Sequence, residues 1–497
     1  MKEYSISEIQ KLMKEGKLTA KQLVKMYLDR INKIDKSGPT INSIIEVNPD
    51  AVKIAENLDQ VRKEDNSLGP LHGIPIIVKD NILTADKMMS TAGSLALEGF
   101  RSTRDAFIVQ KLRDAGAIIL GKANLSEWAN FRSSRSTSGW SSRGGQARNP
   151  YVLDRSPCGS SSGSASSVAA NFCSASIGTE TDGSVVCPAH VNSVVGIKPS
   201  IGLVSRTGII PISHNQDTAG PMGRSVEDAA ILLNAIVGVD KEDAQSITSE
   251  KDIPKDYTEF LDVNGLKNAK IGVARNFFGR NDLVTKVIDK AIEKMEKAGA
   301  IIVDKLMLES VKELREPEYE VLLYDFKNDL NEFLEKFVPE EFPQTMKEII
   351  EFNEKNKEKV MPYFGQEHFL KAEERGPLTD DVYKEALEKC HKYSQEEGID
   401  LAIKENDLDA IIAPTGGPAW PMDLVNGDHF SGGSSSLAAV AGYANITVPV
   451  GYVFGLPVGL SFFSGAFQEP TLLKITYAFE QLTKIRKPPS YLETLKI

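Results

Sequence analysis

The sequence predicts an α/β fold built from layers of sheet and helix. Short apolar runs bounded by Gly, Pro or Asn alternate with longer stretches whose apolar residues recur at helical intervals. This alternation is typical of helices packed on a sheet. The composition is globular, with 497 residues of which 41% are hydrophobic and 26% charged. A chain of this length can bury a sizeable core.

The first half of the chain begins with helices and continues with buried strands. Ser5 with Glu8, and Thr19 with Gln22, have the spacing of capping boxes, so residues 1–62 are expected to form a helical segment. The apolar runs GIPIIVKD and AIILGKAN then indicate strands, with a helix between them that ends at a glycine. The predicted elements are a strand at 73–80, a helix at 105–116 and a strand at 117–124.

The second half repeats the alternation after a capped helix at 225–238. The elements that follow are strands at 269–274, 300–304, 408–414, 445–452 and 455–463, and a helix at 284–299. Residues 308–400 are acidic, poor in glycine and helical in pattern, so we expect them to be an insertion or a lid.

Charge and cysteine usage limit the function classes. The net charge is −11 and the isoelectric point is near 5.3, with no basic run, so we expect no direct nucleic-acid binding. The N-terminal residues lack the apolar core of a signal peptide, and no apolar run approaches the roughly 18 residues that span a membrane. The four cysteines show no CxxC spacing. We therefore expect a cytoplasmic protein with reduced thiols, without a disulfide framework or a zinc site.

Two loops rich in glycine and serine indicate a functional site. The first is SPCGSSSGSASSVAANF at 156–172, and the second is GTETDGSVVCPAHV at 178–191. A flexible linker would separate domains and stay polar, whereas the first loop runs directly into small and apolar residues. A buried loop of this kind must satisfy every backbone amide. Two such loops, with a short helix between them, predict a functional site rather than a linker.

One local pattern suggests a different chemistry. Residues Gly159 to Gly163 read G-S-S-S-G, which matches the nucleophile elbow of α/β-hydrolases with Ser161 as nucleophile. His214 or His429 would then complete a Ser-His-Asp triad. The elbow, however, follows an apolar strand, and here the preceding YVLDRSPC contains Asp, Arg and Pro.

Three segments together resemble the amidase signature family: GIPIIVKDN, CGSSSGSASSVAA and GTETDGSVVCPA. The likeness covers most of residues 1–240 and 408–485. It implies the amidase-signature fold, a central mixed β-sheet covered by helices on both faces, in a single domain over 1–497. Within the family, GWSSRGGQARNPY at 139–151 and the two loops are most similar to peptide amidases, which remove the C-terminal amide from peptides.

The resemblance also implies catalytic residues. The family's Ser-Ser-Lys triad falls on Lys79 as base, Ser160 as bridging serine and Ser184 as nucleophile. The family's peptide bond that enters the bridging serine is cis. Many relatives read G-G-S-S-G-G-S where this chain reads CGSSSGS, so Ser161 remains an alternative bridge.

Neighbouring residues would support this chemistry. Consecutive backbone N–H groups beside the nucleophile can bind an oxyanion, and these belong to Thr181, Asp182, Gly183 and Ser184. Ser162 and Ser164 are expected either to support their loop through hydrogen bonds or to cap the helix that follows. Asp80 either orients the lysine loop or forms a turn.

A lysine base must be neutral, and an ordinary lysine with a pKa of about 10.4 is not. Burial lowers a lysine pKa, and Lys79 ends the apolar run IPIIV. Read alone, this segment also fits a surface lysine at a strand end; the two loops favour the base. His72 and His190 lie near these segments and are expected to be local hydrogen-bonding residues.

The sequence therefore predicts a hydrolase that releases ammonia from a carboxamide through an acyl-enzyme, most simply from the C-terminal amide of peptides. Alternatives are a broad-specificity aliphatic or aryl amidase, the amidase subunit of a tRNA-dependent amidotransferase, and an inactive binding protein. Val186 stands where many relatives carry an arginine, so acidic small amides should be poor substrates. The expected partner is a small-molecule or peptide amide, with no cofactor, metal, nucleic acid or membrane; the sequence does not indicate an oligomeric state.

Overall fold

The computed structural model describes residues 2–65, 68–247, 249, 251, 253–279 and 281–496. Within these ranges, eleven strands form one sheet in the order β1-β3-β2-β6-β8-β7-β12-β13-β11-β9-β10. The strands are β1 (Ile44–Val47), β2 (Pro75–Lys79), β3 (Ile118–Ala123), β6 (Ala175–Glu180), β7 (Val195–Lys198), β8 (Thr218–Gly223), β9 (Lys270–Ala274), β10 (Ile301–Leu306), β11 (Ala410–Pro414), β12 (Asn445–Val453) and β13 (Leu456–Phe463). Two short strands, β4 (Trp140–Ser141) and β5 (Gly145–Gln146), pair with each other.

The sheet is mixed in direction. Strand β2 pairs in parallel with β3 and β6, and β9 pairs in parallel with β10 and β11. The remaining neighbours are antiparallel, including the long β12–β13 hairpin near the centre. Together with helices on both faces of this sheet, the pairing confirms the predicted fold class.

Helices surround the sheet and extend beyond it. They are α1 (Ile6–Lys14), α2 (Ala20–Arg30), α3 (Ala51–Glu64), α4 (Phe107–Asp114), α5 (Ser162–Ala169), α6 (Val186–Val191), α7 (Val226–Ile236), α8 (Asp282–Lys297), α9 (Arg315–Phe337), α10 (Met346–Lys355), α11 (Lys357–Val360), α12 (Glu367–Glu373), α13 (Asp381–His391), α14 (Asp400–Asn406), α15 (Ser436–Val440) and α16 (Glu469–Thr483). No helix in the described part of the chain is long and apolar enough to cross a membrane.

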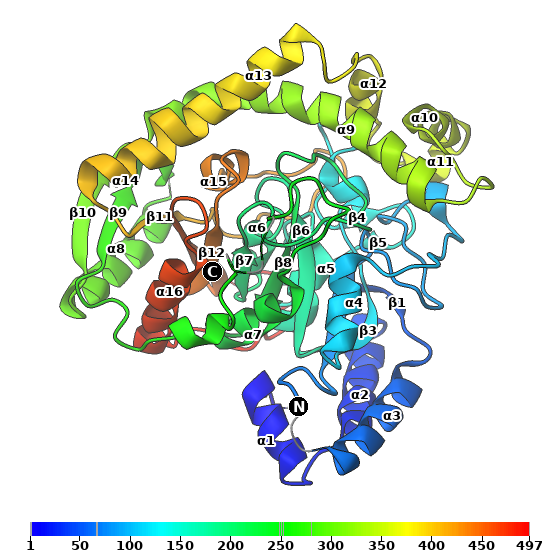
Figure 1. Cartoon of the computed structure of the whole chain (residues 1–497), viewed down its shortest axis with the longest axis horizontal. Coiled ribbons are helices and arrows are strands. Elements are labelled where there is room, and N and C mark those ends of the chain that lie inside the picture. The colour runs from blue at the N-terminus through cyan, green and yellow to red at the C-terminus, as the bar shows by residue number, and fades with distance from the viewer. Residues whose placement is uncertain are drawn as a thin grey trace.

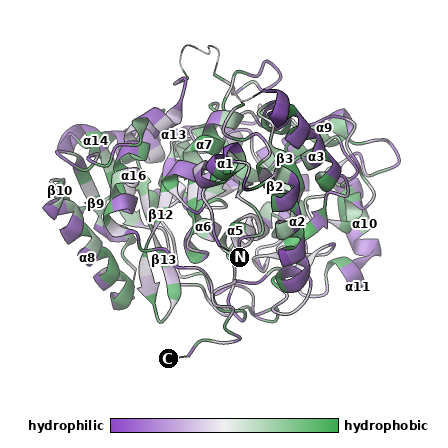
Figure 2. Ribbon diagram, turned by 90° about the horizontal axis from the view of Figure 1, so that it is seen from below, coloured by the Kyte–Doolittle hydropathy of each residue, from purple (hydrophilic) through white to green (hydrophobic). Residues whose placement is uncertain are grey.

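Local sequence signals fix several of these helices. Ser5 and Thr19 each close a capping box, at the start of α1 and α2, and Ser225 accepts a hydrogen bond from the third residue of α7. In α8, the buried residues recur at helical spacing and face inward, so green and purple turns alternate along it in Figure 2. The helical prediction for residues 1–62 missed β1, a four-residue edge strand paired with β3.

The acidic stretch predicted to be helical forms α9 to α13. Helices α9 and α13 run together as a long arc over one side of the sheet (Figure 1), and α10 and α12 pack on α9. Side chains of α9 bond to the segment that precedes β8, through Glu318 with Gln216 and Asp325 with Ser213. A lid role for this region stays a prediction.

Candidate active site

Lys79 is the last residue of β2, a strand buried along its whole length. Strand β2 lies between β3 and β6 in the sheet, so both of its edges are paired and the lysine side chain is fully buried. The apolar run IPIIV therefore delivers an amine into the interior, as the sequence predicted.

The Lys79 amine contacts the first serine loop. Its Nζ donates to Ser160 Oγ at 2.6 Å, to Thr179 Oγ1 at 2.8 Å and to the Thr179 carbonyl at 3.2 Å. Burial lowers the pKa of Lys79 to about 7, although the charges of Asp217 and Glu180 oppose the shift. Near neutral pH a large fraction of this amine is uncharged and able to take up a proton.

The serine-rich stretch is a buried turn that leads into α5. The Gly159–Ser160 peptide bond is cis, as the resemblance implied. A Cβ at Gly159 would lie 2.2 Å from Ser126 Oγ, so only glycine fits there. Ser162 donates its hydroxyl to the Cys158 carbonyl, and Ser164 donates to the Ile177 carbonyl at 3.1 Å. Both side chains thus support the loop, and the stretch is not a linker.

The nucleophile-elbow alternative does not match the geometry. The Ser161 hydroxyl donates to the Thr179 carbonyl at 2.9 Å and accepts from the Thr179 N–H at 3.1 Å. His214 bonds instead to Asp329, and His429 lies 3.9 Å from Asp423. Ser161 therefore has no histidine partner, and its hydroxyl is committed to holding β6 against α5.

Ser184 lies in the second loop, between β6 and α6. Ser184 is 9% exposed to solvent, and its hydroxyl makes no hydrogen bond to another described residue. Gly183 has φ of +79°, and a Cβ there would lie 2.9 Å from Ser435 Oγ, so the loop requires glycine. The Ser161 N–H donates to the Ser184 carbonyl at 3.2 Å, which ties the two loops together.

A buried carboxylate organises the backbone around Ser184. Glu180 Oε2 accepts the N–H groups of Val185 at 2.7 Å and Val186 at 3.0 Å. Among the described residues, the N–H groups of Asp182, Gly183 and Ser184 find no acceptor. Donors left free beside the candidate nucleophile can receive an anionic oxygen. Sequence reasoning missed Glu180, although it lies inside the TETDGS motif.

Asp80 follows the candidate base but does not contact it. Its Oδ2 accepts from the Thr91 hydroxyl at 2.5 Å and from the Gly93 N–H at 3.0 Å, and its Oδ1 lies 3.3 Å from Arg143. Asp80 thus fixes the segment at 91–93, which packs on the lysine loop. The predicted orienting role is indirect.

The histidines near the loops are structural. His72 bonds through Nε2 to the Leu58 carbonyl at 2.9 Å. His190 is fully buried, burial lowers its pKa to about 3, and its Nδ1 accepts the Gly459 N–H at 3.3 Å. Both are local hydrogen-bonding residues, as the sequence predicted.

Comparison with known proteins decides the family. The Amidase family matches residues 22–473. The chain belongs to the amidase family. This amidase superposes on native peptide amidase from Stenotrophomonas maltophilia with a TM-score of 0.93 and 46% identity, covering 98% of this chain and 99% of that chain.

Two curated relatives extend the comparison. A probable amidase of Arabidopsis thaliana is 43% identical over 502 residues, which is 99% of this chain and 92% of the relative. A glutamyl-tRNA(Gln) amidotransferase subunit of Halorhodospira halophila is 31% identical over 513 residues, with 98% and 99% covered. This amidase is a hydrolase that acts on amide carbon–nitrogen bonds.

One prediction about the cysteines was wrong. Cys158 and Cys187 form a disulfide, with their Cα atoms 6.1 Å apart. The two cysteines are 29 residues apart, a spacing that matches no known cysteine motif. The fold brings them together because the start of the Ser160 loop lies against the first turn of α6. The bond joins the two candidate catalytic loops of this amidase. Cys173 and Cys390 are buried free thiols.

A cavity of about 380 Å³ opens beside these loops. Its lining includes Thr179, which contacts Lys79, and Thr181 of the loop that carries Ser184. Charged lining residues lie on the segment before β8, on the segment after α7 and on α9: Arg206, His214, Asp217, Glu242, Asp243, Asp329, Glu332 and Lys336. Carboxyl groups outnumber cationic groups in this lining, so the cavity of this amidase favours neutral or cationic ligands over anionic ones.

Asp217 links that cavity to the loop that carries Ser184. Its Oδ1 accepts the Thr181 hydroxyl at 2.5 Å, and its Oδ2 accepts the N–H groups of Ile212 at 2.7 Å and Ser213 at 3.0 Å. Burial raises the pKa of Asp217 to about 6. The carboxylate therefore holds the segment before β8 against Thr181.

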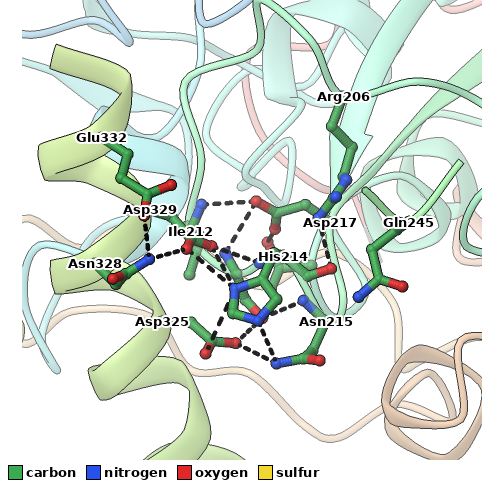
Figure 3. A network of polar contacts seen from close by, with 12 residues as sticks. Arg206, Ile212, His214, Asn215, Asp217, Gln245, Asp325, Asn328, Asp329 and Glu332 are labelled. Atoms are coloured by element: carbon green, nitrogen blue, oxygen red, sulfur yellow. Dashed lines mark hydrogen bonds and ion pairs between the residues drawn. The ribbon is translucent and has the colours of Figure 1, made fainter. Parts of the chain in front are cut away.

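The same segment is tied to α9 by a polar network around His214 (Figure 3). His214 Nδ1 lies 3.0 Å from both carboxylate oxygens of Asp329, and the backbone N–H of His214 donates to Asp329 Oδ2 at 2.6 Å. Asp325 accepts from Ser213 at 2.6 Å and from Asn215 at 2.9 Å. Burial lowers the pKa of His214, but the bonded Asp329 carboxylate outweighs burial and raises it to about 8.

Proposed function

We propose that this amidase releases ammonia from the C-terminal carboxamide of peptides, with Ser184 as nucleophile, Ser160 as bridging serine and Lys79 as base. The observation that carries the proposal is the 2.6 Å contact between a fully buried amine and the Ser160 hydroxyl. The similarity to the S. maltophilia peptide amidase over nearly the whole chain supports the choice of substrate.

The first half of the reaction uses Lys79 to activate Ser184 through Ser160. Neutral Lys79 accepts the Ser160 proton while Ser160 accepts the Ser184 proton, and Ser184 Oγ bonds to the amide carbon. This relay needs the two serine hydroxyls within hydrogen-bonding reach, a contact that commonly tightens when substrate binds. The tetrahedral intermediate carries its negative charge on the former carbonyl oxygen.

The second half releases ammonia and then the acid. The free N–H groups at Asp182, Gly183 and Ser184 stabilise the oxyanion, and the predicted share of Thr181 in this hole stays a proposal. As the carbon–nitrogen bond breaks, the relay returns the proton to the leaving nitrogen. Water then attacks the Ser184 ester by the same relay, and the carboxylic acid leaves.

The charge of the cavity beside the candidate site favours an uncharged amide over the acid it becomes. The cavity lining carries more carboxyl groups than cations, and Val186 is buried where many relatives place an arginine. A carboxylate brought into such a site without a partner costs several kcal/mol. The product acid should therefore leave readily, and acidic small amides should react poorly.

The direct test is ammonia release from a matched set of substrates. We expect a blocked dipeptide amide to give the highest kcat/KM. Among such dipeptides, one that ends in arginine amide should have a higher kcat/KM than one that ends in aspartate amide. Free asparagine and malonamate should be at least tenfold slower. Equal rates for simple aliphatic amides would favour the broad-specificity alternative, and activity that needs a copurifying partner would favour the amidotransferase role.

The role of Lys79 has a separate signature in the pH profile. Because the base must be neutral, kcat/KM for the peptide amide should rise with pH and level off above an apparent pKa of about 7. Below that value the rate should fall about tenfold per pH unit. A profile that stays flat from pH 5 to 8 would contradict the lysine base. His214→Asn serves as the control, because it removes another titrating group and should leave the acid limb in place.

A further inference from the structure

We infer that Glu318 of α9 is a positioning residue for this reaction, which holds the loop before Ser184 through a hydrogen bond between its own carboxyl group and that of Asp182. The inference rests on the proposed function of that loop. Nothing in the sequence motifs points to Glu318, because it lies in the acidic helical stretch that carries no family signature.

The contacts of Glu318 reach the nucleophile loop by two routes. Gln216 Nε2 donates to Glu318 Oε1 at 3.0 Å and to the Thr181 carbonyl at 3.4 Å. The Glu318 carboxyl group also lies against the Asp182 carboxyl group, close enough to share a hydrogen bond once one of them is protonated. Glu318 is buried, at 9% exposure. Glu318 of α9 is therefore linked to Asp182 directly and to the Thr181 carbonyl through Gln216.

The pairing of two carboxyl groups requires a proton between them. Carboxylate oxygens only accept hydrogen bonds, so one member of such a pair must be protonated. Asp182 Oδ2 already accepts the Ser436 hydroxyl at 2.7 Å. Its buried Oδ1 receives no N–H or other hydroxyl within the described ranges. A protonated Glu318 carboxyl group can therefore donate a hydrogen bond to Asp182 Oδ1.

The surroundings of Glu318 favour its neutral form. Burial, and then the negative charge of Asp182, raise the pKa of Glu318 to about 8. The other ionisable group that faces it is the Cys390 thiol of α13, whose pKa burial raises to about 12, so it carries no charge. Gln216 is neutral. Asp182 also interacts with the charges of Lys198 and Glu180, which have opposite signs. A shared proton joins the two carboxyl groups directly.

The consequence for catalysis follows from what the loop holds. The N–H groups of Asp182, Gly183 and Ser184 must point at a developing oxyanion, and small displacements of such donors cost rate. Above about pH 8 Glu318 loses its proton, the two carboxylates repel, and the loop loses its anchor. This predicts an alkaline decline in kcat, with little change in KM.

The test compares two substitutions at one position. Glu318→Gln keeps a donor for Asp182 and an acceptor for Gln216 but cannot ionise, so kcat at pH 7 should stay within about threefold and the alkaline decline should disappear. Glu318→Ala removes both contacts and should lower kcat by roughly 10- to 100-fold, with KM nearly unchanged. The matched control is Glu316→Gln, an exposed glutamate in the same turn of α9, which should keep the wild-type profile.

The outcomes separate this inference from the proposed function. An alkaline decline that persists in Glu318→Gln, or a wild-type kcat in Glu318→Ala, overturns the positioning role. If Glu318→Ala fails to fold, the Glu318→Gln profile still decides. His214→Asn should retain the decline, which excludes one other group with a pKa of about 8. The buried amines of Lys122 and Lys198 have similar pKa values, and loss of the decline in Glu318→Gln assigns it to Glu318 rather than to them. Loss of activity in Ser184→Ala and Lys79→Ala alongside an unchanged Glu318→Gln profile would leave the proposed function intact and refute only this inference.

Discussion

The two candidate catalytic loops at 158–187 and the helical region at 309–406 meet at the candidate site but are built in opposite ways. In the loops, small side chains pack the backbone closely, and serine hydroxyls satisfy neighbouring carbonyls. In the helical region, long acidic helices face solvent, and carboxyl groups of α9 bond to the segment before β8, which in turn contacts Thr181 of the second loop. The candidate reacting groups are therefore held by packing and hydrogen bonds within their own loops, while the helical region supports those loops from outside.

That difference predicts unequal effects of substitution. A change in the loops removes a reacting atom, so it should act on the chemical step. A change on α9 alters only how firmly the loops are held, so it should act on orientation and stability. The expected effect therefore decreases from the reacting groups to the disulfide, and from the disulfide to the contacts of α9.

The largest effect is expected from the reacting groups. Ser184→Ala and Lys79→Ala should each lower kcat by at least roughly 10⁴-fold, because residues that act as a unit fail together. Lys79→Arg should be equally inactive, since a guanidinium cannot give up its proton. Initial rates of ammonia release measure the loss, and circular dichroism shows whether each variant is folded. A folded Ser184→Ala enzyme with wild-type rate would place the chemistry outside these loops.

A smaller effect is expected from the bond that joins the loops. Replacing Cys158 and Cys187 together by serine should lower the free energy of unfolding by about 3 kcal/mol, because the bond no longer restricts the unfolded chain. Urea unfolding with and without a thiol reductant measures the change. The reductant should destabilise the wild-type protein and leave the double variant unaffected. Equal sensitivity of both proteins would assign the effect to something other than this disulfide.

The smallest effect is expected at the link between α9 and the segment before β8. The folded pKa of His214 is about 8, above an unfolded value of about 6.5. Its contribution to stability is therefore complete below about pH 6.5 and is lost as the pH rises through about 8. Because the ring is partly exposed, we expect about 1–2 kcal/mol. Unfolding free energies of wild type and His214→Asn should differ at pH 6 and converge near pH 9; a difference that persists at pH 9 would contradict the ion pair.

Much of the fold could be predicted because its signals are local. Capping boxes at Ser5 and Thr19 marked the first helices, and apolar runs marked β2, β3 and the β12–β13 hairpin. Strand β1 was missed because it has only four residues and lies between two helical stretches, although Gly, Pro, Asn and Asp flank it. Its identity as a strand comes from pairing with β3, which only the folded chain reveals.

In the candidate site, too, residues with a local sequence signal were predicted and residues that depend on tertiary contacts were missed. Lys79, Ser160 and Ser184 lie in motifs that the family resemblance identified, and the structure brings Lys79 and Ser160 into contact. The supporting residues were missed for physical reasons. Asp217 and Glu318 are single carboxyl groups whose importance comes from a tertiary neighbour. The Cys158–Cys187 bond was missed because it depends on the distance between two loops and on no spacing rule.

The disulfide also closes part of the chain into a covalent ring. That ring runs from residue 158 to residue 187 and includes α5, β6 and both candidate catalytic serines. A single backbone cut within it would leave Ser160 and Ser184 in one covalently linked molecule, whichever bond was broken. On a denaturing gel without reductant, such a nicked protein would migrate as one species, and reductant would separate it into two fragments.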